Sequence, residues 1–264
     1  MYWPSVQVSV RESMDLIQNF RLYDLKSLLQ TPLQRARWAM TKALNFPADS
    51  CDIAQARSMR SAREASYQPL DLFALHDGRR FVLKSFCEAS EVRANLVALE
   101  LEMTPSTWAV ESCAFIQEFL PQAPLARQCW AGDCGQELGT SLAVALRLLH
   151  SAGLCYIDSM SRHIFSRKQN RWYLIDYGTA LLVSDPKGPH SEVDHWLLTS
   201  PQSRARSAGA KGSLAHRGML HDWLVWQGEL KKAWLPLMRP RERQACVTAF
   251  ETHYPCPPLN ASDC

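Results

Sequence analysis

The spacing of hydrophobic residues near the amino terminus is that of helices. Between residues 11 and 45, apolar side chains recur at intervals of three or four positions, which is typical of amphipathic helices. Thr31 and Pro32 have the composition of a helix start, with Thr31 as the N-cap and Pro32 as the first helical residue. The pattern therefore predicts helices in this segment, one of them starting at residue 32.

From about residue 67 the hydrophobic residues recur at every second position instead, which indicates β-strands. The stretch from about residue 67 to 86 reads as two strands that are joined at Asp77-Gly78, a strong signal for a tight hairpin turn. Helical spacing returns over residues 87–103, and two more short strands are predicted after Pro105. The predicted buried face of the helix consists of Val92, Leu96, Leu99 and Met103.

The second half of the chain opens with a long amphipathic helix in "DCGQELGTSLAVALRLLHSAGL". Asp133 and Gln136 have the spacing of a capping box at its start. Its predicted buried stripe consists of Leu138, Leu142, Ala145 and Leu149. An irregular segment, "CYIDSMSRHIF", and a strand, "RWYLIDYGTALLV", follow, and the rest is mostly helical. Strands with one helix first and helices afterwards predict an α+β fold with a connector near Pro121 and Pro124.

Composition narrows the class of protein. The 264 residues are 47% hydrophobic, enough to bury a sizeable core, and the net charge of +3 is too small to favour nucleic acid as a partner. No stretch reaches the length of a membrane span, and the amino terminus lacks the basic-then-apolar order of a secretory signal, so we expect a cytoplasmic protein. The nine cysteines form no Cys-x-x-Cys pair, which favours buried thiols over a zinc site.

Three charged residues match the requirements of phosphoryl transfer. That reaction needs a cation on the phosphates, a carboxylate that holds magnesium, and a second carboxylate near the acceptor hydroxyl. Lys84 lies near the end of the predicted strand "FVLK", Asp158 lies in the irregular segment, and Asp176 ends the strand 18 residues later. Each also has a simpler interpretation, as a solvated lysine or as an acid that closes a turn.

Four segments together resemble the protein-kinase-like fold over about residues 60–230: "RFVLK", "EFLP", "LHSAGLCYIDSMSRHIF" and "LIDYGTA". The resemblance implies ATP and Mg²⁺ as cofactors and a bilobal fold with a helical N-terminal extension (1–55), an N-lobe (56–121) and a helical C-lobe (122–264) that carries the catalytic loop. It also implies roles for five residues: Lys84 as the phosphate-binding lysine, Glu118 and Phe119 as the hinge beside adenine, Asp158 as the catalytic aspartate, and Asp176 as the magnesium aspartate.

The segment "DSMSRHIF" resembles the narrower lipopolysaccharide kinase (Kdo/WaaP) family through its Asp-x-x-x-x-His pattern. His163 stands where protein kinases carry a metal-binding Asn, so the resemblance implies a histidine metal ligand, with Mn²⁺ as an alternative to Mg²⁺. A packed or hydrogen-bonded histidine is the competing interpretation. Tyr156 and Ile157 replace the His-Arg of the protein-kinase motif, so regulation through that arginine is not expected.

The phosphate-binding loop departs from the family pattern. The segment "SAREASYQPLDLF" has no glycine, although its small residues, among them Ser61 and Ala65, allow a looser approach to the nucleotide. The absence of glycine supports a catalytically silent, pseudokinase-like binding module as one alternative function.

Two structural partners remain open in the sequence. The helix partner of the strand lysine is Glu91 as first choice, Glu88 as second, and Asn95 in another register. The acid that supports the catalytic loop is Asp222 or Asp194, with Asp222 favoured.

The resemblance implies an ATP-dependent phosphotransferase that phosphorylates a hydroxyl, with a lipopolysaccharide core sugar as the leading acceptor and a protein serine or threonine as the next. Residues 201–243 hold nine Lys or Arg against three acids. This basic segment is either a solvated helical face or a contact with an anionic membrane surface, which would place the protein at the periphery of the inner membrane.

Overall fold

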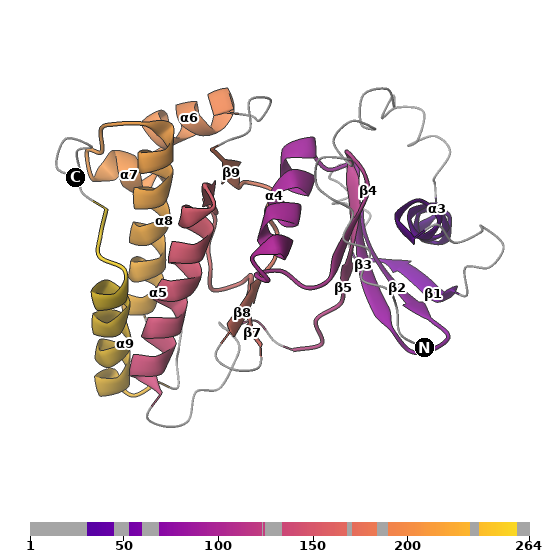
Figure 1. The fold of residues 1–264 in the computed structure, drawn as a ribbon, viewed down its shortest axis with the longest axis horizontal. Helices are drawn as coiled ribbons and strands as arrows, with labels where there is room; N and C mark the ends of the chain where they lie inside the picture. Colours follow the sequence, from indigo (N-terminus) through magenta and orange to yellow (C-terminus); the bar gives the residue numbers. More distant parts are fainter. Residues whose placement is uncertain are drawn as a thin grey trace. The chain divides into compact units, whose positions relative to one another are not determined.

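The computed structural model describes residues 31–44, 53–59, 69–122, 124, 134–167, 171–183, 190–232 and 238–257 (Figure 1). Contacts within the chain group the described residues into two compact units. Unit 1 contains those up to Glu88 and Thr107–Phe119, and unit 2 contains Ala89–Ser106 and those from Leu120 onward. The predicted helices before residue 31 and the small residues Ser61 and Ala65 lie outside the described part of the chain.

Unit 1 is built on a five-stranded antiparallel sheet in the order β1-β2-β3-β5-β4. The strands are β1 (Ile53–Ser58), β2 (Leu70–Leu75), β3 (Arg80–Ser85), β4 (Thr107–Glu111) and β5 (Ala114–Glu118). Helix α3 (Pro32–Leu44) lies against one face of this sheet (Figure 1). The core between them includes Ala36, Ala39, Met40, Phe73, Phe81, Leu83 and Ile116.

The predicted hairpin between β2 and β3 is confirmed. Gly78 has φ +87°, a conformation that residues with a Cβ rarely adopt, and its amide donates to the Leu75 carbonyl (3.0 Å). Asp77 accepts the amide of Arg79 through its side chain (3.0 Å). Both of these bonds are local to the turn.

The predicted start of α3 is also confirmed. Thr31 accepts the Gln34 amide through Oγ1 (3.2 Å), and the Gln34 side chain accepts the Thr31 amide (2.9 Å), which is a reciprocal capping box. One turn further, the Arg35 guanidinium donates to both carboxylate oxygens of Asp71 on β2 (2.5 and 2.9 Å). Because both side chains are buried, this two-bond ion pair fixes the helix on the sheet.

Unit 2 is mainly helical. Its helices are α4 (Ala89–Glu100), α5 (Gly135–Ser151), α6 (His190–Thr199), α7 (Arg204–Ser207), α8 (Leu214–Lys231) and α9 (Pro240–His253). Its strands form two short antiparallel pairs, β6 (Leu154–Cys155) with β9 (Leu181–Leu182), and β7 (Ile164–Arg167) with β8 (Arg171–Leu174). No helix in the described part of the chain is both long and apolar enough to cross a membrane.

Helices α5 and α9 approach each other closely (Figure 1). A Cβ built on Gly139 would lie 2.0 Å from the backbone oxygen of Cys246, and one on Gly135 would lie 2.0 Å from that of Glu242. The predicted α5 stripe of Leu138, Leu142, Ala145 and Leu149 is buried, as expected. The two glycines therefore let the α9 backbone reach this stripe.

Two local predictions in unit 2 differ from the structure in part. Helix α5 has Cys134 as its N-cap instead of Asp133, which lies outside the described residues, and the Gly135 amide is capped from a distance by Glu242 (3.2 Å). Of the predicted α4 face, Val92 and Met103 are buried, but Leu96 and Leu99 are only partly buried, so the buried face is rotated from the predicted one. Its buried residues are Glu91, Val92, Ala94, Asn95 and Ala98.

Gly139→Ala tests the close approach of α5 and α9. The added methyl group would overlap a backbone carbonyl, so we expect a loss of about 1–3 kcal/mol in the free energy of unfolding, measured in urea. Gly228→Ala is the matched control, because a Cβ at this α8 position meets nothing within 4 Å. Alanine favours helix, so we expect the control to be neutral or up to about 1 kcal/mol more stable. Equal effects from the two substitutions would refute the close approach.

Candidate active site

The structure brings three sequence-predicted residues of unit 2 together, with the ring of His163 between Asp158 and Asp176. Its Nδ1 lies 3.8 Å from Asp158 Oδ2, and its Nε2 lies 3.9 Å from Asp176 Oδ2. Asp158 and His163 are the two ends of one loop, residues 158–163, which follows β6, while Asp176 follows β8. The two carboxylates are 40% and 46% exposed, so both are accessible from solvent.

Tyr156 determines which nitrogen of His163 carries the proton. Its hydroxyl donates to the Ile175 carbonyl (2.7 Å) and lies 2.9 Å from His163 Nδ1. Burial, followed by the charges of Asp176 and Asp158, raises the Tyr156 pKa well above its usual value, so the hydroxyl keeps its single hydrogen. Since that hydrogen is used on Ile175, Nδ1 must be the donor to the phenol oxygen. A neutral His163 then has its lone pair on Nε2, the nitrogen nearer Asp176.

The backbone is strained on both sides of this cluster. Ile157, the residue before Asp158, has φ +68°, and Asp176 itself has φ +63°. Such conformations are costly for residues with a Cβ, above all for a β-branched one, and persist only when the surroundings hold them. Behind Asp176, the ring of Tyr177 is fully buried and packs edge-on against Tyr156 at 5.5 Å.

Asp222 of α8 holds the backbone that leads into the loop. Its fully buried carboxylate accepts the amides of Tyr156 (2.6 Å) and Ile157 (2.7 Å), and His150 of α5 lies 3.0 Å away through Nε2. Of the two acids that the sequence left open, Asp222 is thus the one observed in this position. The side chain of Asp194 lies outside the described part of α6.

The sequence did not single out His221, which precedes Asp222 on α8. Its ring contacts α6 and α7 and the backbone of Ile157. Its buried ring accepts the Arg204 amide through Nδ1 (3.0 Å) and packs edge-on against Trp196. Burial lowers the His221 pKa, although the negative charge of Asp222 and a hydrogen bond with the Ile157 backbone act in the opposite direction. The ring is therefore favoured in its neutral form, which an Nδ1 acceptor requires.

His150, Cys155 and Asp222 form a second cluster, with ligand atoms within 4.8 Å of one another. Its chemistry does not fit a metal ion. The Asp222 oxygens already accept backbone amides, and burial together with the Asp222 charge raises the Cys155 pKa well above its usual value. A cysteine binds a metal as its thiolate, so a protonated buried thiol is a poor ligand. This cluster instead supports the loop backbone.

The remaining predicted site residues lie partly in unit 1. Lys84 is buried on β3, where it is paired with Leu70 and Phe115, and Glu118 ends β5. The Phe119 amide donates to the Arg80 carbonyl (2.9 Å), and the Arg80 guanidinium lies over the Phe119 ring at 4.7 Å.

The candidate partners of the lysine differ in burial. Glu91 and Asn95 are buried in α4, where the side-chain NH₂ of Asn95 donates to the Glu91 backbone carbonyl (3.0 Å), whereas Glu88 is exposed. Since Lys84 belongs to unit 1 and Glu91 to unit 2, their pairing stays a prediction.

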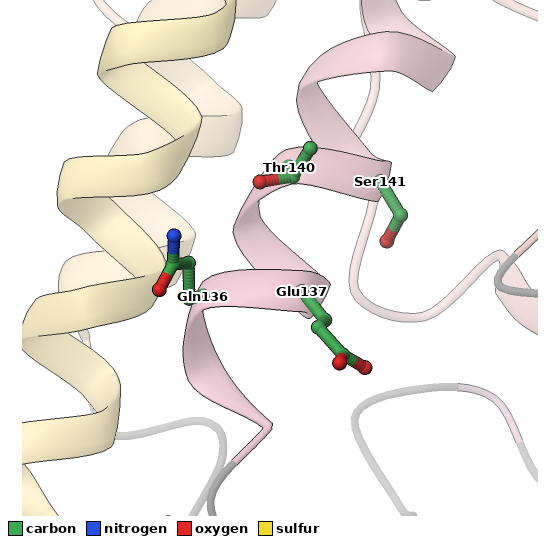
Figure 2. Close-up of a pocket in the computed structure, with 4 residues that line it drawn as sticks. All are labelled: Gln136, Glu137, Thr140 and Ser141. Carbon is green, nitrogen blue, oxygen red and sulfur yellow. The ribbon is translucent and has the colours of Figure 1, made fainter.

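A depression of about 460 Å³ lies elsewhere on unit 2, along α5. Figure 2 shows four described residues that line it, Gln136, Glu137, Thr140 and Ser141, which belong to this helix. Ser141 Oγ is already used, because it accepts Trp172 Nε1–H (3.0 Å) and donates to the Leu138 carbonyl (2.9 Å). None of the sequence-predicted site residues in the described part of the chain belongs to this lining, so we place the candidate site at the 158–163 loop instead.

Comparison with models of known protein families gives no match, and no curated protein sequence matches the chain. The interpretation of the site therefore depends on its own residues and on the resemblance of the motifs.

His221→Gln tests the neutral buried histidine. A pKa lowered in the folded state means that the unfolded chain binds the proton more tightly, so stability is complete above about pH 6.5 and decreases as the pH falls below it. We expect the free energy of unfolding to fall more steeply for wild type than for the variant between pH 6.5 and 5. The difference in slope is at most about 1.4 kcal/mol per pH unit. His253→Gln, at an exposed position of α9, should keep the wild-type slope, and a wild-type slope in His221→Gln would contradict the assignment.

Proposed function

We propose that the chain is an ATP-dependent phosphotransferase with a bilobal kinase-like fold that phosphorylates a hydroxyl. The observation that carries the proposal is the His163 ring lying within 4 Å of both Asp158 and Asp176, two acids from separate segments that are partly open to solvent. The division of the chain into one unit with a five-stranded antiparallel sheet and one mainly helical unit is consistent with the fold.

Asp158 is the residue that we assign to the acceptor. Its Oδ1 accepts the Ser159 amide (2.6 Å), and Oδ2 is the oxygen nearer His163. One carboxylate oxygen is thereby oriented by the backbone, while the side chain stays 40% exposed. In this role Asp158 accepts a hydrogen bond from the acceptor hydroxyl and takes its proton as transfer proceeds.

Asp176 and His163 are the residues that would hold a divalent cation. The donor set fits, because a carboxylate oxygen and the Nε2 lone pair left by the Tyr156 hydrogen bond lie on the same side of the imidazole. When bound, the cation would neutralise charge on the phosphates of ATP. Lys84 is the residue that we assign to the non-transferred phosphates, by resemblance.

The leading acceptor is a lipopolysaccharide core sugar, because of the Asp158-to-His163 spacing, and a protein hydroxyl is the alternative. The basic segment 201–243 is a weaker argument for an anionic acceptor. Two of its arginines donate to nearby backbone carbonyls, Arg206 of α7 to Thr199 at the end of α6, and Arg217 of α8 to Gly212 (2.5 Å). Part of its charge is therefore structural.

Substitution of the two acids tests the proposal. Turnover of labelled ATP is measured against lipopolysaccharide, protein extract and water, and nucleotide binding by the thermal shift that ATP produces with magnesium. We expect Asp158→Asn to lower turnover at least about hundredfold and to keep the thermal shift, since it loses only a proton acceptor. Asp176→Asn should lower both, because it loses a metal ligand.

The outcomes distinguish the alternatives. A magnesium-dependent thermal shift without transfer to any acceptor would favour the pseudokinase-like module, and no shift at all would reject nucleotide binding. Small and equal effects of the two substitutions on turnover would reject the assigned roles.

His163→Asn tests the histidine as a ligand. Imidazole suits manganese better than magnesium, whereas an amide oxygen suits magnesium, so we expect the ratio of turnover with manganese to that with magnesium to fall by at least about threefold.

Tyr156→Phe keeps the ring of Tyr156 but removes the hydroxyl that fixes the His163 tautomer. We expect it to raise the metal concentration for half-maximal turnover by about tenfold.

His253→Asn is the control for the metal ratio, because this histidine is exposed on α9. If wild type, His163→Asn and the control all give the same ratio, His163 is a structural residue instead of a ligand.

A further inference from the structure

Helix α8 directs a second carboxylate, Glu229, at the loop that contains Asp158. Glu229 follows Asp222 by seven residues, so the two acids lie on the same face of α8. Two helical turns separate them by about 10 Å along the helix axis. Asp222 accepts the amides of Tyr156 and Ile157, on the amino-terminal side of Asp158. Glu229 contacts Ser159 and Ser161, on the carboxyl-terminal side of Asp158.

The contacts of Glu229 use both of its oxygens. Oε1 accepts the hydroxyls of Ser159 and Ser161 (3.3 Å for Ser161), and Oε2 accepts the Ser161 amide (3.0 Å). Burial raises the Glu229 pKa, while these hydrogen bonds from Ser159 and Ser161 act to lower it. A carboxylate withdrawn from water needs such donors, so the contact holds the loop and the helix to each other.

Asp158 lies between the two attachments. Ser159 connects Glu229 directly to it, since its hydroxyl donates to Glu229 and its amide donates to Asp158 Oδ1 (2.6 Å). Beyond Ser161 the chain turns back, because the His163 amide donates to the Met160 carbonyl (3.0 Å). The orientation of the Asp158 carboxylate therefore depends on where Glu229 holds Ser159.

We propose that Glu229 is a positioning residue for phosphoryl transfer, which sets the orientation of Asp158 through Ser159 and Ser161. The inference rests on the proposed function and adds to it a residue that the motifs do not contain. A carboxylate that handles the acceptor proton must be held in reach of it, and a loop free to move populates the productive orientation only part of the time. Loss of the Glu229 contacts therefore lowers kcat and leaves the binding of nucleotide nearly unchanged.

The geometry distinguishes positioning from charge. In Glu229→Gln, the amide oxygen can accept the Ser161 amide while the NH₂ group donates to the two hydroxyls, which rotate to accept. Glu229→Met keeps a side chain of similar length and removes every hydrogen bond. A positioning role predicts rescue by Gln and loss with Met.

The experiment compares these variants with Glu251→Met. Glu251 is the matched control, because this 40% exposed acid of α9 also contacts α8, through Gln227 and Lys231. We expect Glu229→Met to lower kcat at least about tenfold, with KM for ATP within about twofold of wild type. Glu229→Gln should stay within about threefold of wild-type kcat, and the control should match wild type.

A second measurement does not depend on activity. Amide hydrogen exchange of residues 159–161 should become faster in Glu229→Met and stay slow in Glu229→Gln, because only the latter keeps an acceptor for the Ser161 amide. Exchange in α5 should be the same in all variants. Unchanged exchange at residues 159–161 in Glu229→Met would overturn the inference.

The two proposals can fail separately. If wild type transfers phosphate and Glu229→Met keeps its kcat, the positioning role is wrong and the proposed function stands. If wild type transfers phosphate to no acceptor, the proposed function fails, and hydrogen exchange alone decides whether Glu229 holds the loop. Should Glu229→Met not fold, Ser159→Ala combined with Ser161→Ala removes the hydroxyl contacts and keeps the hydrogen bond from the Ser161 amide to Oε2. That variant should lower kcat at least about threefold, and wild-type kcat in it would overturn the inference.

Discussion

The arrangement of unit 2 depends on one buried negative charge. The carboxylate of Asp222 is withdrawn from solvent, and such a group is stable only where donors replace the lost water. The donors are two consecutive amides, those of Tyr156 and Ile157, together with the His150 ring. Tyr254 continues the network, with its hydroxyl 2.7 Å from His150 Nδ1. These bonds connect α5, α8 and the end of α9 to the segment between β6 and the loop 158–163.

This constraint explains why strained backbone can persist beside the candidate site. Ile157 has a positive φ while Asp222 holds its amide, and Asp176 has a positive φ while the buried ring of Tyr177 follows it. Tyr156 connects the loop 158–163 to the segment that follows β8, because its hydroxyl contacts both His163 and Ile175. The three residues Asp158, His163 and Asp176 thus lie beside buried supporting groups, although all three side chains are partly exposed.

Local signals in the sequence were sufficient wherever the stabilising bonds are local. The Asp77-Gly78 turn and the Thr31 capping box each close within four residues, so their residue types predict them. The α5 stripe was predictable because one face of that helix is uniformly apolar. The face of α4 was not, because its buried side includes polar Glu91 and Asn95, which a hydrophobic pattern cannot indicate. The cap of α5 comes from Glu242, 107 residues away in the chain, and no local pattern contains it.

The same distinction applies to the candidate site. By itself the sequence determined the order of elements and the candidate acids, since Asp158 and Asp176 are marked by their own segments and spacing. Only the tertiary structure decided that His163 lies beside both acids, that Tyr156 sets its tautomer, and that Asp222 and Glu229 hold the loop. The physical reason is that a buried polar group must find its partner in space, and Asp222 and Glu229, which hold the loop, lie on α8, more than 60 residues along the chain from it.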